Sequence, residues 1–433
     1  MQKNLLAMIA SAETVSYIGK IENIVGMSME ASGGSASIGD IVMIYNEEQK
    51  KQIPAEVVGF REDRIQLMAY ENMNGIGAGS FVRNTGKRLK IPVGEALRGR
   101  VINALGRPMD GKDPIVSARY YYVESPEINP LDRPPIREPL EFGVKAIDGL
   151  NTIGKGQRIG IFAGSGVGKS TLLGMIARNV TADINVIALV GERGREVREF
   201  IEKDLGTEGM KRSVLIVATS DQPAMLRMKC PLVATTIAEY FKDQGKDVLL
   251  MMDSLTRFAM AQREIGLANG EPPVARGYTP SIYAEFPKLL ERSGRFKNGS
   301  ITGVYTVLVE GDDTNEPVAD TVRGILDGHI VLSRKLANQN HFPAIDISAS
   351  ISRLMTEIVP AEHRELAARI RDILSVYQQN EDLISIGAYK AGANPRLDYA
   401  VSKINAVNEF LTQGIEEAFS ITESVEKMGA ILN

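Results

Sequence analysis

The sequence has few of the residues that build disulfide-linked or metal-held scaffolds. Its 433 residues include one cysteine, Cys230, so no internal disulfide can form and no cage of thiolates can hold zinc. The three histidines, His329, His341 and His363, lie apart in the sequence and do not predict a metal cluster. No apolar run approaches the roughly 20 residues that a membrane-spanning helix requires.

The sequence also has no large excess of charge of either sign. Lys and Arg number 50 against 54 Asp and Glu, which gives a net charge of −4. This balance argues against a dominant basic surface for nucleic acid. The apolar stretch within Met1–Ala10 is short and interrupted, so it does not fit a secretory signal. We therefore expect a cytosolic enzyme or assembly subunit with two or three domains.

The order of sequence patterns predicts an α/β protein in three parts. Residues 1–90 contain short strand patterns separated by turns, which indicates a small N-terminal β-barrel. Residues 91–355 hold the central domain, with a Pro-rich connector at about 124–140 that should run extended because proline lacks a backbone donor. Residues 356–433 carry apolar residues at helical spacing and predict a helical C-terminal domain.

Within the central domain, apolar strand-like runs alternate with helical stretches. This alternation predicts a mostly parallel sheet with helices on both faces. The expected strands are Arg158–Ala163, Asn185–Val190, Val214–Ala218, Val248–Met252 and Ser300–Val309. In the C-terminal part the expected helices are Glu362–Tyr377, Leu397–Gly414 and Glu416–Leu432, and the expected barrel strands include Val15–Ile21, Ile41–Tyr45, Glu56–Gly59 and Arg64–Ala69.

A glycine-rich loop between a predicted strand and a predicted helix is the strongest chemical signal. The stretch Ala163–Ser170 reads AGSGVGKS, which departs from the usual phosphate-loop pattern only in its first alanine. Glycines let backbone N–H groups face phosphate oxygens, and the following helix adds its positive end. The alternative is an ordinary Gly-rich turn. The loop predicts a nucleoside triphosphate site made by Gly164, Ser165, Gly166, Val167, Gly168, Lys169, Ser170 and Thr171.

Hydrolysis requires groups beyond a phosphate loop, and two strand ends supply them. Lys169 should reach the β- and γ-phosphates, while Ser170 and Asp253, which ends an apolar strand, would hold Mg²⁺. Glu192 ends another strand and is the candidate for polarising water, because ligands gather at the carboxyl ends of parallel strands. A turn residue at Asp253 and a solvated charged turn at Glu192 are the alternatives. Nearby cations are Arg193, Arg195 and Arg257, and Arg257 could instead face solvent.

These motifs together resemble the catalytic subunits of the rotary ATP synthase superfamily, and most closely the export ATPases of flagella and type III secretion systems. Pro343–Ser352 (PAIDISASIS) matches the superfamily's signature. The export branch is favoured by Gly194, where the synthase chain typically has threonine, and by Asn129–Ile136 and Leu255–Pro273. The resemblance runs from about Gly19 to the C-terminal helices. It implies a β-barrel, a RecA-like phosphate-loop domain and a helical domain.

The resemblance also implies residue roles that the motifs alone do not assign. Arg353 would be an arginine finger that reaches the neighbouring subunit's nucleotide, and Arg257 would lie near the γ-phosphate. Phe342 and Tyr389 would stack on adenine, although from sequence alone Phe342 is more often a core residue. Residues 266–280 would line the central channel of a hexamer and engage a coiled-coil stalk.

The resemblance further implies ATP and Mg²⁺ as cofactors and a homo-hexamer as the working form. The implied partners are a regulator of the export apparatus, the stalk protein, secretion substrates and their chaperones, with no nucleic acid. The implied location is cytoplasmic, peripheral at the export gate on the inner membrane. Only about 14 residues precede the expected barrel, so regulator binding there stays open, and Met1–Glu13 could form a short amphipathic helix.

Four functions are compatible with these patterns. A motor that energises flagellar protein export is favoured, partly because the N-terminal segment is short, and a non-flagellar type III secretion ATPase is its near relative. A catalytic subunit of a proton-coupled ATP synthase shares the same motifs. A hexameric RNA translocase is disfavoured by the charge balance. A non-catalytic nucleotide-binding subunit is disfavoured by Glu192 together with Lys169.

Overall fold

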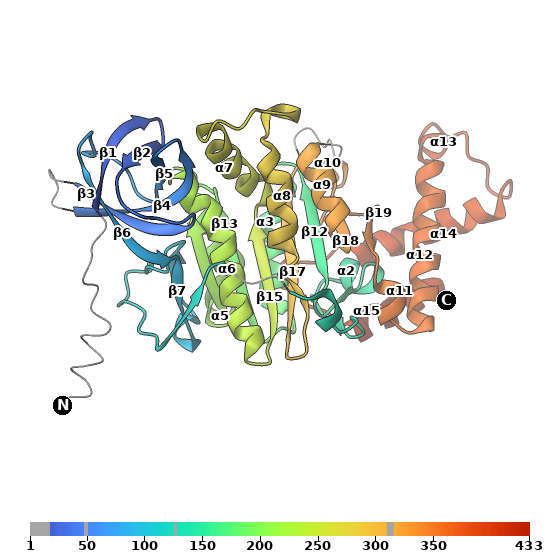
Figure 1. Cartoon of the computed structure of the whole chain (residues 1–433). Coiled ribbons are helices and arrows are strands. Elements are labelled where there is room, and N and C mark those ends of the chain that lie inside the picture. Colours follow the sequence, from blue (N-terminus) through green and yellow to red (C-terminus); the bar gives the residue numbers. More distant parts are fainter. Residues whose placement is uncertain (1–17, 47–50, 125–127, 310–315) are drawn as a thin grey trace.

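The computed structural model describes residues 18–46, 51–124, 128–309 and 316–433. A barrel lies at one end of the molecule, a sheet covered by helices forms the middle, and a group of helices forms the other end (Figure 1). This arrangement confirms the predicted fold class. The expected helix at Met1–Glu13 falls outside the described residues. Within the described parts, no helix is both long and apolar enough to cross a membrane.

The N-terminal part is a closed barrel of antiparallel strands in the order β1-β2-β5-β4-β3-β6. Side chains such as Met29, Val42, Ile44, Ile53 and Leu67 fill its interior and are almost inaccessible. The barrel strands are β1 Ile18–Val25, β2 Ser28–Ser32, β3 Asp40–Asn46, β4 Lys51–Arg61, β5 Arg64–Ala69 and β6 Phe81–Arg88. The first strand therefore extends beyond the predicted end at Ile21.

Short elements connect the barrel to the central domain. Two of them, β7 Lys90–Val93 and β9 Arg119–Tyr122, pair with each other as an antiparallel ribbon. The described part of the Pro-rich connector is irregular apart from the short turn η2 Pro130–Asp132 and a two-residue strand at its end, which is consistent with its missing backbone donors. The remaining short elements here are η1 Glu95–Leu97, β8 Val101–Asn103, β10 Pro139–Leu140 and β11 Ile153–Gly154.

The central sheet runs in the order β19-β18-β12-β17-β15-β13-β14-β8. All neighbours in this path are parallel except β18 and β19, and the short strand β16 adds antiparallel to β17. The predicted mostly parallel sheet is therefore confirmed, with an antiparallel strand at one edge. The strands are β12 Arg158–Ala163, β13 Ile184–Val190, β14 Ser213–Ala218, β15 Asp247–Asp253, β16 Gly294–Arg295, β17 Ser300–Leu308, β18 Gly328–Leu332 and β19 Ile345–Ser352.

Both faces of this sheet are buried, which explains the continuous apolar runs in its strands. Val186 and Ala188 face one hydrophobic cluster, whereas Ile187 and Leu189 face a second cluster on the other side. The helices of the central part are α2 Lys145–Leu150, α3 Lys169–Asn179, α4 Gly194–Glu199, the π-helical η3 Phe200–Leu205, α5 Gly206–Lys211, α6 Ala224–Asp243, α7 Leu255–Ala268, η4 Ala275–Gly277, α8 Pro280–Leu290, α9 Pro317–Ile325 and α10 Arg334–Asn338.

The C-terminal part is helical, as predicted, but two expected boundaries are wrong. The structure has a break between Leu411 and Ile421, where the sequence pattern predicted helix almost throughout. The last helix begins after Ser420, whose side chain forms a reciprocal capping box with Glu423. The C-terminal helices are α11 Met355–Ile358, α12 Ala361–Gln379, α13 Glu381–Ser385, α14 Pro395–Leu411 and α15 Ile421–Leu432.

Candidate nucleotide site

A cleft of about 840 Å³ opens where several parallel strands end. Its lining includes Ala163 at the end of β12, Glu192 just after β13, Leu308 at the end of β17 and residues from α7. Connections that leave the carboxyl ends of parallel strands diverge there, so a cleft at this edge is the usual ligand site of such a sheet. The cleft therefore brings together residues that lie more than 100 positions apart in sequence, such as Ala163 and Leu308.

The phosphate loop forms one wall of the cleft. Gly166 and Gly168 adopt φ values of 77° and 91°, a region that side chains with a Cβ rarely enter. These values let the loop turn sharply into α3, which begins at Lys169. Val167 differs from the rest of the loop because its side chain is buried in the core, so it could offer a ligand only its backbone.

Three charged side chains meet at one wall of the cleft, which Lys169 and Glu192 line and where Asp253 contacts Lys169. The Lys169 ammonium donates a hydrogen bond to the Asp253 carboxylate and lies 3.7 Å from Glu192 Oε1. Thr306 on β17 donates a second hydrogen bond of 2.7 Å to Asp253 Oδ1. Burial disfavours charge on Lys169, but the charges of Asp253 and Glu192 outweigh it and raise the pKa of the ammonium.

Glu192 has the electrostatic environment of a proton acceptor. Burial first, and the negative charge of Asp253 second, raise the pKa of Glu192 to about 7 against the opposing effect of Lys169. Its Oε1 atom is buried and accepts no hydrogen bond from the residues that the structure describes. A carboxylate that lines a cleft and has a pKa near neutrality is suited to orient and deprotonate water.

Two predicted arginines also line the cleft. The side chain of Arg257 packs against Gly191, and its buried Nε has no hydrogen-bond partner among the described residues. A buried guanidinium nitrogen without an acceptor fits an anionic ligand such as a phosphate. Arg193 is far more exposed and lies 3.8 Å from Glu196 in a surface ion pair. Arg257 therefore fits the phosphate better than Arg193 does.

The oxygen donors of the site fit Mg²⁺ bound together with a nucleotide. In the described residues no three or more His, Cys, Asp or Glu side chains are grouped to hold a metal. The Ser170 hydroxyl and the Asp253 carboxylate are two oxygen donors beside Lys169. Mg²⁺ commonly binds through one or two carboxylates together with substrate phosphates and water, so these donors fit that mode.

The two predicted adenine platforms lie in different surroundings. The Phe342 ring is 40% exposed, and it lies 3.5 Å from where a Cβ on Gly168 would be. It therefore flanks the phosphate loop with an open face. Tyr389 follows α13, is not part of the cleft lining and donates its phenol hydrogen to Asp398 on α14. Its role on adenine stays a prediction.

Arg353 lies at the amino-terminal ends of the parallel strands, whereas the phosphate loop lies at their carboxyl ends. It directly follows β19, whose last residue Ser352 pairs with Gly328 at the start of β18. The phosphate loop follows Ala163, which pairs with Leu332 at the other end of β18. At about 3.3 Å per residue, these ends of the strands are separated by roughly 13 Å. The exposed Arg353 side chain is not part of its own chain's cleft.

Several residues in or beside the cleft were missed by the motif analysis. Thr306 on β17 does not line the cleft, but it bonds Asp253, and nothing in the pattern of its buried strand marks it. Arg263, Arg276 and Arg334 line the cleft from α7, η4 and the start of α10. Lone arginines on helices are usually solvated, so only the three-dimensional arrangement reveals them.

Comparison with known proteins supports a nucleotide site in this cleft. Family models match the chain in three consecutive stretches: the β-barrel domain of the ATP synthase alpha/beta family at 21–86, its nucleotide-binding domain at 143–352, and the C-terminal domain of the type III secretion EscN ATPase at 359–430. The flagellum-specific ATP synthase of Bacillus subtilis is 54% identical over 430 residues, covering 99% of this chain and 98% of that protein. The chain belongs to the ATP synthase alpha/beta family.

Solved structures place it in the export branch of that family. The assembled ATPase EscN of the enteropathogenic E. coli type III secretion system matches with a TM-score of 0.91 and 47% identity, covering 96% of this chain and 100% of that one. EscN in complex with its central stalk EscO matches with a TM-score of 0.89 and 46% identity over the same shares. Family membership confirms the predicted resemblance and identifies the chain as a nucleotide-binding ATPase.

Proposed function

We propose that this chain is the ATP-hydrolysing subunit that energises protein export through a flagellar type III secretion apparatus. It works as a homo-hexamer, and each active site is shared between two neighbouring chains. The observation that carries the shared site is the position of Arg353. Lys169, Glu192 and Asp253 meet in the cleft at one edge of the sheet, whereas Arg353 is exposed at the other edge. An arginine so placed serves a neighbour's nucleotide.

Each charged group of the cleft has a distinct role in this proposal. Lys169 exchanges its contact with Asp253 for the β- and γ-phosphates of ATP, and Arg257 binds the same anion. Ser170 and Asp253 hold Mg²⁺, which neutralises phosphate charge. Glu192 orients water and accepts its proton. Arg353 of the neighbouring chain stabilises the charge of the transition state, which is typically worth 10³ to 10⁵ in rate.

The outer surfaces serve assembly and partners. We assign residues 1–90 to a barrel domain, 91–355 to the ATPase domain and 356–433 to a helical domain. The segment 266–280, from the end of α7 to the start of α8, lines the central channel and contacts a coiled-coil stalk. The solved complex of EscN with its central stalk EscO supports a stalk as a partner. We further assign a regulator, secretion substrates and chaperones as partners, a cytoplasmic location and peripheral contact with the export gate.

Within the nucleotide site, we assign Phe342 to stacking on adenine.

The dependence of turnover on assembly tests the shared site. Wild-type protein is separated into monomers and hexamers by gel filtration, and the size of each is verified by analytical ultracentrifugation. We expect Mg²⁺-ATP hydrolysis per chain to be at least about a thousandfold lower in monomers, because they lack the neighbour's arginine. Lys169→Ala is the matched negative control in both fractions. Equal turnover per chain in monomers and hexamers would contradict the proposal.

A non-flagellar type III secretion system is the second candidate, because EscN is 47% identical and matches almost the whole chain. The 54% identity to a flagellum-specific relative favours the flagellar system. Expressing the chain in a bacterium whose own flagellar export ATPase has been deleted separates the two. Restored secretion of flagellar proteins, absent with Glu192→Gln, supports the flagellar assignment, and restoration of only a virulence-type system contradicts it.

A further inference from the structure

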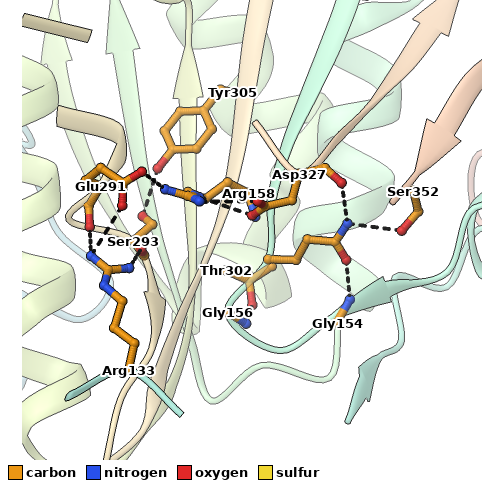
Figure 2. Close-up of polar contacts among 11 residues, drawn as sticks. Arg133, Gly154, Gly156, Arg158, Glu291, Ser293, Thr302, Tyr305, Asp327 and Ser352 are labelled. Atoms are coloured by element: carbon orange, nitrogen blue, oxygen red, sulfur yellow. Dashed lines mark hydrogen bonds and ion pairs between the residues drawn. The ribbon is translucent and has the colours of Figure 1, made fainter. Parts of the chain in front are cut away.

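A polar network surrounds the backbone of Arg353 at the edge of the sheet away from the cleft. The Arg353 N–H donates a 3.0 Å hydrogen bond to the carbonyl of Asp327, the residue just before β18. The Gln157 amide donates to this same carbonyl at 3.1 Å and to Ser352 Oγ at 3.0 Å (Figure 2). Ser352 in turn donates to the Thr152 carbonyl at 2.7 Å. These hydrogen bonds hold Ser352, which precedes Arg353, and the Asp327 carbonyl, which accepts the Arg353 N–H.

Asp327 is held by Arg158 at the start of β12. Its carboxylate accepts hydrogen bonds from the Arg158 backbone N–H at 3.0 Å and from Nε and Nη2 at 3.1 and 3.2 Å. The Asp327 N–H donates to the Arg158 carbonyl at 2.9 Å. Two backbone and two guanidinium contacts fix both the place and the orientation of Asp327, as bidentate arginine–carboxylate pairs do.

Arg158 also connects this site to α8. Its Nη1 pairs with the carboxylate of Glu291, the residue that ends α8 (Figure 2). Burial disfavours the Arg158 charge, but contacts with Asp327 and Glu291 outweigh burial and raise the pKa of the guanidinium. Arg133, from the Pro-rich connector, donates to the carbonyls of Glu291 and Ser293. Through these contacts the Pro-rich connector, the end of α8 and the start of β12 are linked to Asp327. The Asp327 carbonyl in turn accepts the hydrogen bond of the Arg353 N–H.

We propose that Asp327, clamped by Arg158 and Gln157, is a positioning residue that aims Arg353 at the nucleotide of the neighbouring chain. This inference rests on the proposed shared site. The cleft's own Lys169, Glu192 and Asp253 have no contact with the network, so Asp327 affects the arginine-donating side of a chain and not its nucleotide-holding side. Such a one-sided effect separates positioning from a general structural role.

The kinetic test uses Asp327→Asn, which keeps the backbone contacts and the side-chain size but removes the charge. We expect kcat to fall about ten- to a hundredfold, because a misplaced catalytic group costs this much, while KM for ATP stays within about twofold. Asp372→Asn is the matched control, because that carboxylate is half-exposed on α12 and pairs with Arg396 on α14, away from Arg353. It should leave both constants unchanged.

The decisive test mixes variant chains and measures Mg²⁺-ATP hydrolysis. Asp327→Asn mixed with Glu192→Gln should exceed the sum of the two alone, because about one interface in four combines an intact Glu192 with a well-aimed Arg353. Asp327→Asn mixed with Arg353→Ala should show no excess, because both chains are impaired on the same side. An excess in both mixtures, or in neither, overturns the positioning role.

Two controls keep the outcome interpretable. The pair Glu192→Gln and Arg353→Ala tests the shared site itself, and its failure in verified mixed hexamers would count against the proposed function and not against Asp327 alone. If Asp327→Asn does not fold, Ser352→Ala, which loses the contacts to Gln157 and Thr152, replaces it in the same two mixtures. The same one-sided rescue is expected, and its absence contradicts the proposal.

Discussion

Glu192 shows how one residue can be both unfavourable for folding and suited to catalysis. Its carboxyl is buried beside the like charge of Asp253, and these two effects raise its pKa from the ordinary 4.5 to about 7 despite Lys169. The unfolded chain ionises this group above about pH 4.5, whereas the folded chain resists ionisation until about pH 7. The cost to folding therefore grows between these values and is fully present above pH 7.

Replacing Glu192 with glutamine removes this cost. In the absence of nucleotide, we expect Glu192→Gln to raise the melting temperature by about 2 °C or more at pH 8, and the difference to shrink towards zero at pH 5. Differential scanning calorimetry at both pH values measures it. Glu208→Gln is the control, because that side chain is 82% exposed. A difference of the same size at both pH values would contradict the electrostatic account.

For single residues, the sequence predicts the site where each residue directly follows a recognisable strand. The phosphate loop, Glu192 and Asp253 each end a predicted strand, so the parallel sheet alone predicts that they meet. Thr306, which bonds Asp253, and Arg263, which lines the cleft, could not be predicted, because each comes from an element whose own pattern shows only burial or solvation. Arg353 was assigned from a family resemblance, and its distance from its own cleft emerged only from the register of β18 and β19.

At the scale of elements, strands were predicted better than helix ends. Runs buried on both faces, such as β13 and β15, stand out by composition. The segment 412–420 was predicted as largely helical because apolar residues continue through it, although the capping pair Ser420 and Glu423 was readable. Apolar spacing reports which residues face a core, and it does not report where the backbone leaves the helix.

A buried ion pair joins the barrel to the central domain. Lys229 on α6 contacts Glu56 on β4 at 2.8 Å, with exposed side-chain fractions of 5% and 9%. Tyr70 donates a hydrogen bond to the same carboxylate. Removing one partner leaves a buried charge without compensation, which typically costs 3 to 5 kcal/mol.

We therefore expect Lys229→Ala to lower the free energy of unfolding by about 3–5 kcal/mol, measured by urea denaturation of the nucleotide-free protein. Lys211→Ala is the matched control, because Lys211 is 65% exposed and pairs with Glu208 within the same helix. The control should change the free energy by less than about 0.5 kcal/mol. Equal losses in the two variants would show that the barrel contact contributes little.

At the scale of the whole molecule, the strands of the sheet separate the two groups of residues that form the proposed shared site. One edge holds the cleft with Lys169, Glu192 and Asp253, and the other edge holds Arg353 in the network of Asp327 and Arg158. Heterologous contacts between identical chains can close into a ring that brings these opposite edges together. The proposed site therefore needs Lys169, Glu192 and Asp253 from one chain and Arg353 from its neighbour.

Mixing two inactive variants tests this claim most directly. Glu192→Gln and Arg353→Ala are purified separately, combined, and assayed for Mg²⁺-ATP hydrolysis after mixed oligomers have been verified by mass. Each variant alone should be nearly inactive. The mixture should recover up to about a quarter of the wild-type turnover, because one interface in four then joins an intact Glu192 to an intact Arg353. No recovery in verified mixed oligomers would contradict a site shared between identical chains.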